Sequence, residues 1–354
     1  MNDIYMRQTI YLAKKGIGFV NPDPLVGAIL VKNDKIVGSA YKSFYGEDAV
    51  IKAIDNAGED SANSELYTNF EPDWESVFKS GVKRIYIGAL DINPDKDPKN
   101  IERIANSGIE VITNVLKQDC ESLNEIYLHF ISKGTPFVFT KWAMSLDGKI
   151  ATRTGDSKWI SGDESLEFVH HLRQRVAAIM VGENTVRKDN PMLTTRLKGV
   201  KISNPVRIIL SRHGDINMDA NVLKIDESMK TIIVVSSNIS IEKENAFLNK
   251  GAEIIKLDEV NGRIDFKVML KELGKRKIDS LYIEGGSGVL GSAFESKIVN
   301  KVYVAVAPKI IGGKEAVTAV AGKGIDKMAD AIVLNKVTHE VIGSDVIISG
   351  YINN

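Results

Sequence analysis

The sequence predicts two α/β domains, each built around a largely parallel sheet, and three observations support this. Apolar, β-branched runs alternate with amphipathic segments along the chain, and strands that alternate with helices form parallel sheets covered on both faces. A length of 354 residues favours two domains over one. A helical segment that ends at Gly134 and Pro136 separates the two series of elements, which places the domains at 1–135 and 136–354.

The first domain is expected to open with an amphipathic helix over 3–16, closed by Gly16. A hairpin follows, because the runs LVGAILVK and KIVGSAY are separated by Asn33 and Asp34, a polar pair suited to a tight turn. The remaining elements are expected in the order helix 48–57, strand SELYTNF, helix 74–80, strand RIYIGAL, helix 100–107, strand IEVITNV and one helix over 119–132.

The second domain repeats the alternation and ends in strands only. Its last two β-rich runs, KVYVAVAPKI and VIGSDVIISGYI, are expected to form an antiparallel hairpin or edge. The preceding strands are expected at FVFTKWAM, AAIMVG, PVRIILS, TIIVVSS, EIIKL and SLYIEGG.

Composition excludes several classes of function. The chain has 46 basic and 46 acidic side chains, so its net charge of zero offers no general attraction to nucleic acid or to an anionic membrane. A single cysteine, Cys120, excludes an intrachain disulfide framework. The first residues lack the apolar run of a signal peptide, and Lys141 interrupts FVFTKWAM, so no segment is long enough to span a membrane. We expect a cytoplasmic protein.

Three clusters of polar residues follow predicted strands. The first, KWAMSLDGKIATRTGDSKWISGDES, surrounds one strand end with small polar side chains and contains Trp159. A large aromatic side chain in such a loop favours a packing surface for a planar ligand, although it could instead anchor a solvated loop. The second cluster is VGENTVRKDNPMLTTR, at another strand end, where α/β proteins bind ligands.

The third cluster, SLYIEGGSGVLGSAF, is a strand that ends at Glu284 and leads through glycines into a helix. Glycines allow close approach of the backbone to a phosphate, and a helix N-terminus offers free N–H groups. The spacing is not the G-x-G-x-x-G fingerprint, so it favours a dinucleotide site that is not a Rossmann first turn.

Arginines supply the candidate phosphate contacts. Arg173, Arg196 and Arg212 could each bind phosphate through two N–H groups, although an individual arginine is more often a surface salt-bridge partner. Ser211 and Arg212 directly follow the strand PVRIILS, which suggests a place for the extra phosphate of NADPH. The five histidines have no metal-ligand spacing, and we interpret all of them as non-catalytic.

Taken together, KWAMSLDGKIATRTGDSKWIS, GENTVRKDNPMLTTR and YIEGGSGVLGSAF resemble the reductase half of the bifunctional riboflavin-biosynthesis deaminase/reductase family, RibD. The segment NPDPLVGAILVKNDKIVGSAY is similar to the opening of that family's deaminase half, so the resemblance covers nearly the whole chain. It implies a cytidine-deaminase-like α/β/α domain followed by a dihydrofolate-reductase-like α/β domain. It also implies NADPH, a phosphorylated pyrimidine substrate and a homodimer.

The resemblance assigns roles to individual residues. It implies that the substrate contacts Ser157, Arg173, Leu193, Arg196 and Glu284. Asp189 and Glu284 are the catalytic candidates, but an ordinary aspartate is ionised at neutral pH, so Asp189 is expected to position the nicotinamide ribose and the proton to come from water or the substrate amine. The implied cofactor contacts are Ala143, Trp159, Thr185, Asp189, Gly286, Ser287, Gly288, Val289, Leu290, Gly291 and Ser292, besides Ser211 and Arg212.

The first domain departs from the family at its zinc site, which needs one histidine, two cysteines and a glutamate that shuttles protons. Here GEDAVIKAI places Asp48 at the histidine position and Val50 at the glutamate position. In NFEPDWESVFKSG, Asp73 stands where the first cysteine belongs, and the second cysteine is missing. Zinc accepts carboxylate ligands, but the proton shuttle is missing as well. We therefore predict no zinc and no deaminase activity.

The favoured function is reduction, with NADPH, of 5-amino-6-(5-phosphoribosylamino)uracil to the ribitylamino product. One alternative is a reductase of the undeaminated diaminopyrimidine or of a related pterin or pyrimidine. A second is a nucleotide-binding protein without turnover. The retained Asp189, Arg196 and Glu284 speak against the second alternative, because abandoned catalysis predicts erosion at these positions as well.

Overall fold

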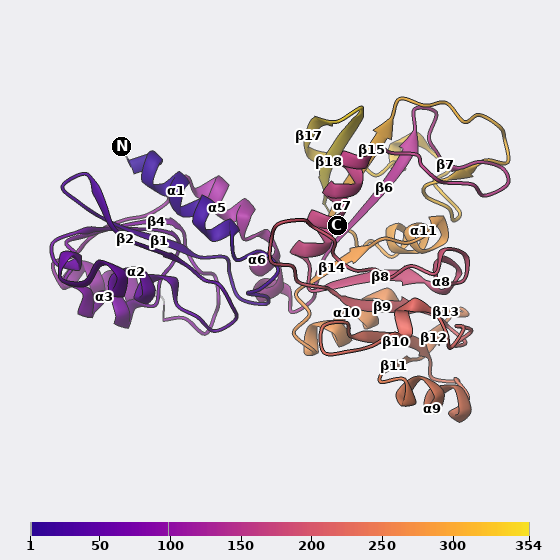
Figure 1. Cartoon of the computed structure of the whole chain (residues 1–354), viewed down its shortest axis with the longest axis horizontal. Helices are drawn as coiled ribbons and strands as arrows, with labels where there is room; N and C mark the ends of the chain where they lie inside the picture. Colours follow the sequence, from indigo (N-terminus) through magenta and orange to yellow (C-terminus); the bar gives the residue numbers. More distant parts are fainter. Residues whose placement is uncertain (1, 98, 354) are drawn as a thin grey trace. The chain divides into compact units, whose positions relative to one another are not determined.

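The computed structural model describes residues 2–97 and 99–353, and it divides into two compact units with the boundary between Gly134 and Thr135 (Figure 1). We refer to residues up to Gly134 as unit 1 and to residues from Thr135 as unit 2. Within the described residues, the longest helices are too short or too polar to cross a membrane.

Unit 1 contains a five-stranded sheet in the order β2-β1-β3-β4-β5. The predicted hairpin is confirmed: Asn33 and Asp34 have φ angles of 51° and 58°, as a two-residue type I′ turn requires. Because β1 also pairs antiparallel with β3, the sheet is mixed and not largely parallel as predicted. The strands are β1 Gly27–Lys32, β2 Lys35–Tyr41, β3 Glu65–Phe70, β4 Arg84–Ala89 and β5 Glu110–Ile112.

Helices cover both faces of this sheet. Figure 1 shows α1 and α5 on one side and α2 and α3 on the other. Met6 and Cys120 belong to the core on the first side, and Val50 and Trp74 to the core on the second. The helices are α1 Asn2–Lys14, α2 Ala49–Ala57, α3 Trp74–Ser80, α4 Asn100–Asn106, α5 Lys117–Leu123 and α6 Glu125–Lys133, with a 3-10 turn at Gly58–Ser61.

The single helix expected over 119–132 is two helices, α5 and α6, which meet at Asn124. The buried Asn124 side chain accepts a hydrogen bond from Leu25 N at 2.7 Å and donates one to Leu25 O at 3.0 Å. The backbone of Asn124 has φ −99° and ψ 20°, which departs from helical geometry and separates the two helices. The sequence pattern did not reveal this partner, because it lies 99 residues away.

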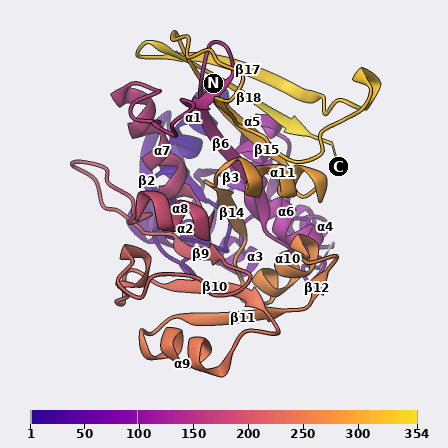
Figure 2. The same ribbon diagram turned by 90° about the vertical axis from the view of Figure 1, so that its right-hand side faces the viewer.

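Unit 2 contains a nine-stranded sheet in the order β11-β10-β9-β8-β14-β6-β15-β18-β17. All pairs from β11 to β15 are parallel, and β18 pairs antiparallel with β15, as expected for the two C-terminal β-rich runs. β17 was not predicted as a separate strand, and it forms a hairpin with β18. Figure 2 shows this hairpin at the opposite end of the sheet from β11 and α9. The strands are β6 Phe137–Ser145, β8 Ala178–Gly182, β9 Val206–Leu210, β10 Thr231–Ser236, β11 Glu253–Leu257, β14 Ser280–Ile283, β15 Lys301–Ala307, β17 Leu334–Ile342 and β18 Asp345–Ile352.

The core of unit 2 lies between this sheet and its helices. Leu270, Leu273 and Leu290 from α10 and α11 pack with Val138 and Ile283 of the strands. The helices are α7 Asp163–Arg175, α8 Glu183–Asp189, α9 Ile241–Asn249, α10 Phe266–Lys275 and α11 Ser287–Glu295, with 3-10 turns at Asn221–Leu223 and Met328–Asp330. Two small antiparallel pairs were not predicted: β12 Glu259–Val260 with β13 Arg263–Ile264, and β7 Lys149–Ala151 with β16 Val317–Thr318.

Candidate functional site

The end of β14, the middle of β6 and one face of α7 border a cavity of about 350 Å³, which we call the strand-end cavity. β14 pairs in parallel with both β6 and β8, so residues that follow these strands emerge at one edge of the sheet. The cavity is lined by Lys141, Trp142, Ala143, Ile150, Ser157, Lys158, Trp159, Ile160, Ser161, Leu166, Val169, His170, Arg173, Arg196, Tyr282, Glu284, Gly285 and Leu290.

A charge pair joins two predicted site residues in this cavity. The Arg173 guanidinium donates to both carboxylate oxygens of Glu284, from Nε at 2.9 Å and from Nη2 at 2.6 Å. A third N–H, on Nη1, donates to Thr194 O at 3.0 Å. Arg173 is buried in the last turn of α7, and Glu284 directly follows β14. A bidentate contact with a guanidinium holds the carboxylate in a fixed orientation.

Lys141 brings a buried ammonium into the same cavity from the middle of β6. Burial lowers its pKa to about 8, the charge of Arg173 also lowers it, and Glu284 and Asp345 oppose the shift. The sequence analysis began the first polar cluster at Lys141 but gave this residue no role in the site. The signal was nevertheless visible, since a lysine inside an apolar strand must be buried, exposed at an edge or functional.

One buried polar atom in the cavity wall, Trp142 Nε1, has no hydrogen-bond partner among the described residues. An unpaired buried polar group costs about 1–3 kcal/mol. Burial raises the pKa of Tyr282 well above its ordinary value, and the nearby Glu284 carboxylate adds to the shift.

Trp159 lies on the segment 157–161, all five residues of which line the cavity. Its side chain is 68% exposed. An indole that is so exposed does not anchor its loop in the core. Of the two interpretations from the sequence, a packing surface for a planar ligand therefore remains.

His170 also lines the cavity, although the sequence analysis gave the histidines no role. Its Nδ1 accepts a hydrogen bond from Arg196 N at 3.2 Å. Burial, followed by the charges of Arg173 and Arg196, lowers the pKa of His170 to about 4. The imidazole is therefore neutral at pH 7 and stabilises the loop that carries Arg196.

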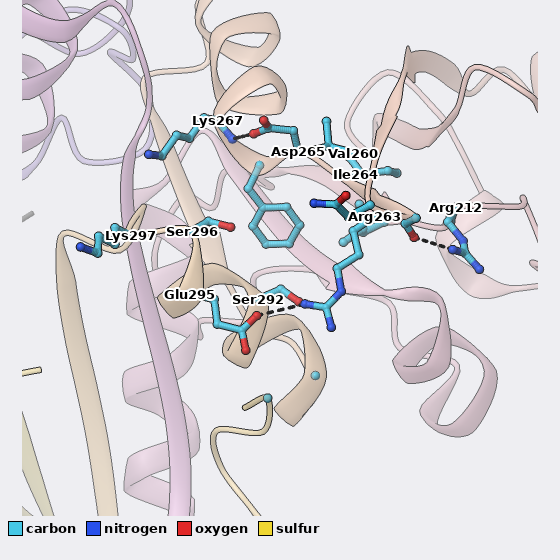
Figure 3. Close-up of a pocket in the computed structure, with 16 residues that line it drawn as sticks. Arg212, Val260, Arg263, Ile264, Asp265, Lys267, Ser292, Glu295, Ser296 and Lys297 are labelled. Atoms are coloured by element: carbon cyan, nitrogen blue, oxygen red, sulfur yellow. Dashed lines mark hydrogen bonds and ion pairs between the residues drawn. The ribbon is translucent and has the colours of Figure 1, made fainter. Parts of the chain in front are cut away.

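A second hollow, of about 1160 Å³, runs beside α11, and we call it the α11 groove. Figure 3 shows Arg212 at one end and Lys267 with Lys297 at the other, while Arg263 reaches towards Glu295. Arg263 pairs with Glu295 at 3.0 Å. The groove is lined by Leu210, Arg212, Val260, Asn261, Gly262, Arg263, Ile264, Asp265, Phe266, Lys267, Gly288, Ser292, Glu295, Ser296, Lys297 and Gly322.

The glycine-rich turn before α11 divides into open and packed positions. A side chain at Gly288 would meet no protein atom within 4 Å, so the space beside this glycine is open to a ligand. At Gly286 the nearest atom to an added Cβ would be Thr185 Oγ1, at 3.7 Å. Gly291 has a different role, because a Cβ there would lie 2.1 Å from Ala321 O. Among the other predicted cofactor residues, Ser292 lines the groove, Leu290 lines the strand-end cavity, Val289 packs on the core and Ser287 O accepts a bond from Ala321 N.

Eight predicted site residues line neither hollow: Thr185, Asp189, Leu193, Ser211, Gly286, Ser287, Val289 and Gly291. Asp189 is exposed at the end of α8, and Leu193 is buried with a φ of 55°. Ser211 is fully buried and its hydroxyl donates to Glu183, so it does not accompany Arg212 into the α11 groove. Arg212 itself donates to Gly262 O and lies 3.6 Å from Glu259.

In unit 1, the residues at the positions of the expected zinc site have structural partners. Asp48 caps α2, with Oδ1 accepting from Val50 N at 2.7 Å and Ile51 N at 3.0 Å. Val50 is buried in the core. Glu71 accepts from Trp74 Nε1 and from Asp91 N, each at 2.9 Å.

Neither Asp73 nor Cys120 is arranged as a metal ligand. Asp73 caps α3, and burial raises the pKa of the Cys120 thiol to about 12. Nowhere in residues 2–97 and 99–353 do three or more His, Cys, Asp or Glu side chains gather as a metal-binding group.

Comparisons with known proteins show the family of the chain. Residues 136–348 match the family described as the RibD C-terminal domain. The riboflavin biosynthesis protein RibD of Actinobacillus pleuropneumoniae is 37% identical, over 98% of this chain and 95% of its own. RibD of Bacillus amyloliquefaciens is 36% identical, with the same coverage.

Solved structures are similar over both units. The Thermotoga maritima diaminohydroxyphosphoribosylaminopyrimidine deaminase/5-amino-6-(5-phosphoribosylamino)uracil reductase has a TM-score of 0.85 at 32% identity, covering 99% of each chain. The similarity confirms the predicted fold class, a deaminase-like domain followed by a dihydrofolate-reductase-like domain. Together these findings make the chain an oxidoreductase of riboflavin biosynthesis and show that it belongs to the RibD family.

Proposed function

We propose that the chain reduces 5-amino-6-(5-phosphoribosylamino)uracil to the ribitylamino product with NADPH, and that unit 1 does not deaminate. The observation that carries the proposal is the strand-end cavity, where Lys141, Arg173 and Arg196 supply positive charge beside Glu284. These groups suit a substrate that combines a phosphate with a polyhydroxylated sugar. Family membership supplies the class of reaction.

The two hollows suit a dinucleotide that passes along α11. Gly288 borders open space in the α11 groove, and Arg212, Arg263 and Lys267 place positive charge around it. Ala143 and Trp159, at the strand-end cavity, would contact the nicotinamide end, and Arg212 the 2′-phosphate. When bound, NADPH supplies the hydride that adds to the former anomeric carbon of the substrate.

Substrate binding is assigned to the arginines. Three of the five N–H groups of Arg173 are used for Glu284 and Thr194 among the described residues, which leaves two for the 5′-phosphate. Arg196 is exposed at the cavity and adds a second guanidinium. Glu284, held by Arg173, is oriented to accept hydrogen bonds from the sugar hydroxyls or the base.

The reaction also needs a proton. As hydride adds to the anomeric carbon, the bond from that carbon to the ring oxygen breaks and the oxygen takes up one proton. Lys141 is protonated at neutral pH, below its pKa of about 8, and can deliver this proton or stabilise the developing negative charge on the oxygen. Asp189, exposed and outside both hollows, receives no role in this step.

The absence of deamination is supported by the partners of the unit 1 residues. Asp48 and Asp73 cap helices, and Glu71 is held by Trp74 and Asp91. Val50, at the position of the proton shuttle, carries no titratable group. Unit 1 is then retained for its fold and not for zinc-dependent deamination.

The assay that tests the proposal offers the deaminated and the undeaminated pyrimidine separately to the purified protein, with NADPH. We expect NADPH oxidation with the deaminated compound alone, together with formation of the ribitylamino product. Oxidation with only the undeaminated compound would change the substrate assignment. Binding of NADPH without oxidation in either arm would favour the non-catalytic alternative. Light scattering tests the expected homodimer separately.

A further inference from the structure

Lys309, just beyond β15, connects a distant part of the chain to the wall of the strand-end cavity. Its Nζ donates to Trp159 O at 2.7 Å and to Ile160 O at 2.9 Å. Both carbonyls belong to the segment 157–161 that lines the cavity. A single ammonium thus holds the middle of a segment that is 149 residues away in sequence.

The position of Lys309 follows from the sheet. β6 and β15 are parallel neighbours with Ser145 opposite Ala307, so the residues that follow the two strands leave the sheet side by side. Leu146 N donates to Lys309 O at 2.7 Å. The Asp147 carboxylate accepts from Ile311 N at 3.0 Å and Gly312 N at 2.7 Å. These bonds hold the backbone of Lys309 close to the cavity.

The ends of the segment are held by other groups. Lys158 N donates to Asp156 Oδ1 at 3.2 Å near its start. Just past its end, Gly162 N donates to the buried carboxylate of Asp345 at 2.8 Å. Lys309 acts between these two points, next to Trp159, whose side chain is mostly exposed and gains little from packing. The two Lys309 bonds are therefore well placed to decide how Trp159 is presented.

We infer that Lys309 is a positioning residue of the reductase site, which fixes the 157–161 segment and the Trp159 indole against the strand-end cavity. The inference rests on the proposed function, because it assigns Trp159 to the wall that receives NADPH. Lys309 acts through the backbone of its neighbours and does not itself line the cavity. Its removal should loosen one wall of the site and leave the core of unit 2 in place.

The test combines kinetics with a signal from Trp159 in the ligand-free protein. Lys309→Met removes both hydrogen bonds while keeping a chain of similar length, and Lys309→Arg retains the charge and the donors. We expect Lys309→Met to raise the KM for NADPH about fivefold, as exposed charge-assisted bonds allow, with kcat within about twofold of wild type. Lys309→Arg should recover most of the loss. Lys314→Met, an exposed lysine of the same loop, is the matched control and should leave KM unchanged.

The second readout needs neither substrate nor cofactor. In protein labelled with 5-fluorotryptophan, the three tryptophans give separate ¹⁹F signals, and Trp159→Phe assigns one of them. Lys309→Met should shift or broaden the Trp159 signal and spare that of Trp74 in unit 1. An unchanged Trp159 signal, or an equal effect of Lys314→Met, would overturn the inference. If the wild type oxidises no NADPH, the proposed function fails while the ¹⁹F result still decides the role of Lys309.

Discussion

Units 1 and 2 both resemble enzyme domains, but they use their polar side chains differently. In unit 2, Lys141, Arg173 and Glu284 face a cavity, and one buried polar atom in its wall, Trp142 Nε1, lacks a partner among the described residues. In unit 1, Asp48 caps a helix and Glu71 is bonded on both oxygens. The difference teaches that polar groups left available beside a cavity, and not the fold alone, indicate where chemistry takes place.

The largest effect is expected from removal of the ion pair between Arg173 and Glu284 in unit 2. Arg173→Met removes the bidentate partner of Glu284, whose side chain is 27% exposed. We expect a fall in kcat/KM of more than about 100-fold together with a lower Tm. Steady-state kinetics and thermal unfolding measure the two effects. A variant with wild-type kcat/KM would remove the pair from the site.

The second prediction concerns pH. Lys141 loses its proton as the pH rises through about 8, so kcat/KM should fall above that pH, about tenfold per pH unit. Stability should move the other way: the folded pKa lies below the ordinary value of 10.5, so the unfolded chain binds more protons between these values and stability rises with pH. Lys141→Met should abolish the alkaline fall in activity. The same alkaline limb in that variant would assign it to another group.

The third prediction separates substrate binding from turnover. Arg196→Ala removes an exposed guanidinium from the cavity, and a charge-assisted hydrogen bond contributes about 1.5–3 kcal/mol. The KM for the phosphorylated substrate should rise about 10- to 100-fold, with kcat little changed. Inorganic phosphate, added as a competitor, should inhibit the wild type better than the variant. Equal inhibition of both would place the phosphate elsewhere.

The fourth prediction concerns the choice of cofactor. Arg212→Ala should weaken NADPH about tenfold and leave NADH nearly unchanged, because only NADPH carries a 2′-phosphate. Its bond to Gly262 O leaves other N–H groups of the guanidinium for a phosphate. Arg263→Ala, at the same groove, is the informative companion variant. Equal losses for both cofactors would show that Arg212 supports the groove and does not select the cofactor.

The smallest effect is expected in unit 1. Asp48→Ala removes an N-cap and should lower stability by about 1 kcal/mol without changing kcat/KM for the reduction. Unfolding of the variant and of the wild type measures the change in stability, and the NADPH assay measures kcat/KM. A large loss of reductase activity in this folded variant would mean that unit 1 contributes more than its fold.

Sequence periodicity predicted most elements, because the apolar runs and the turn residues are local signals. It missed the break in the helix at Asn124, whose side chain bonds to the distant Leu25. It also missed the pairing of β1 with β3, which makes the sheet of unit 1 mixed. The parallel sheet of unit 2 made it predictable that residues after its strands lie at one edge of the sheet. Their contacts were not, since the pairing of Arg173 with Glu284 joins residues 111 positions apart.

Motif resemblance placed several site residues at the two hollows but could not sort them by role. Gly288 faces open space and Gly291 contacts the backbone of Ala321, although both belong to one glycine-rich turn. Ser211 follows its strand as predicted, yet its hydroxyl is buried against Glu183. Lys141 was missed because a lone lysine in a strand carries no motif.

The most direct test of the contrast between the units measures both chemistries on one sample of the wild-type protein. NADPH oxidation is followed with the deaminated pyrimidine, and ammonia release and zinc content are measured with the undeaminated one. We predict steady NADPH oxidation, no ammonia above the blank and no stoichiometric zinc. Ammonia release with about one zinc per chain, or no NADPH oxidation with the deaminated pyrimidine, would contradict the account.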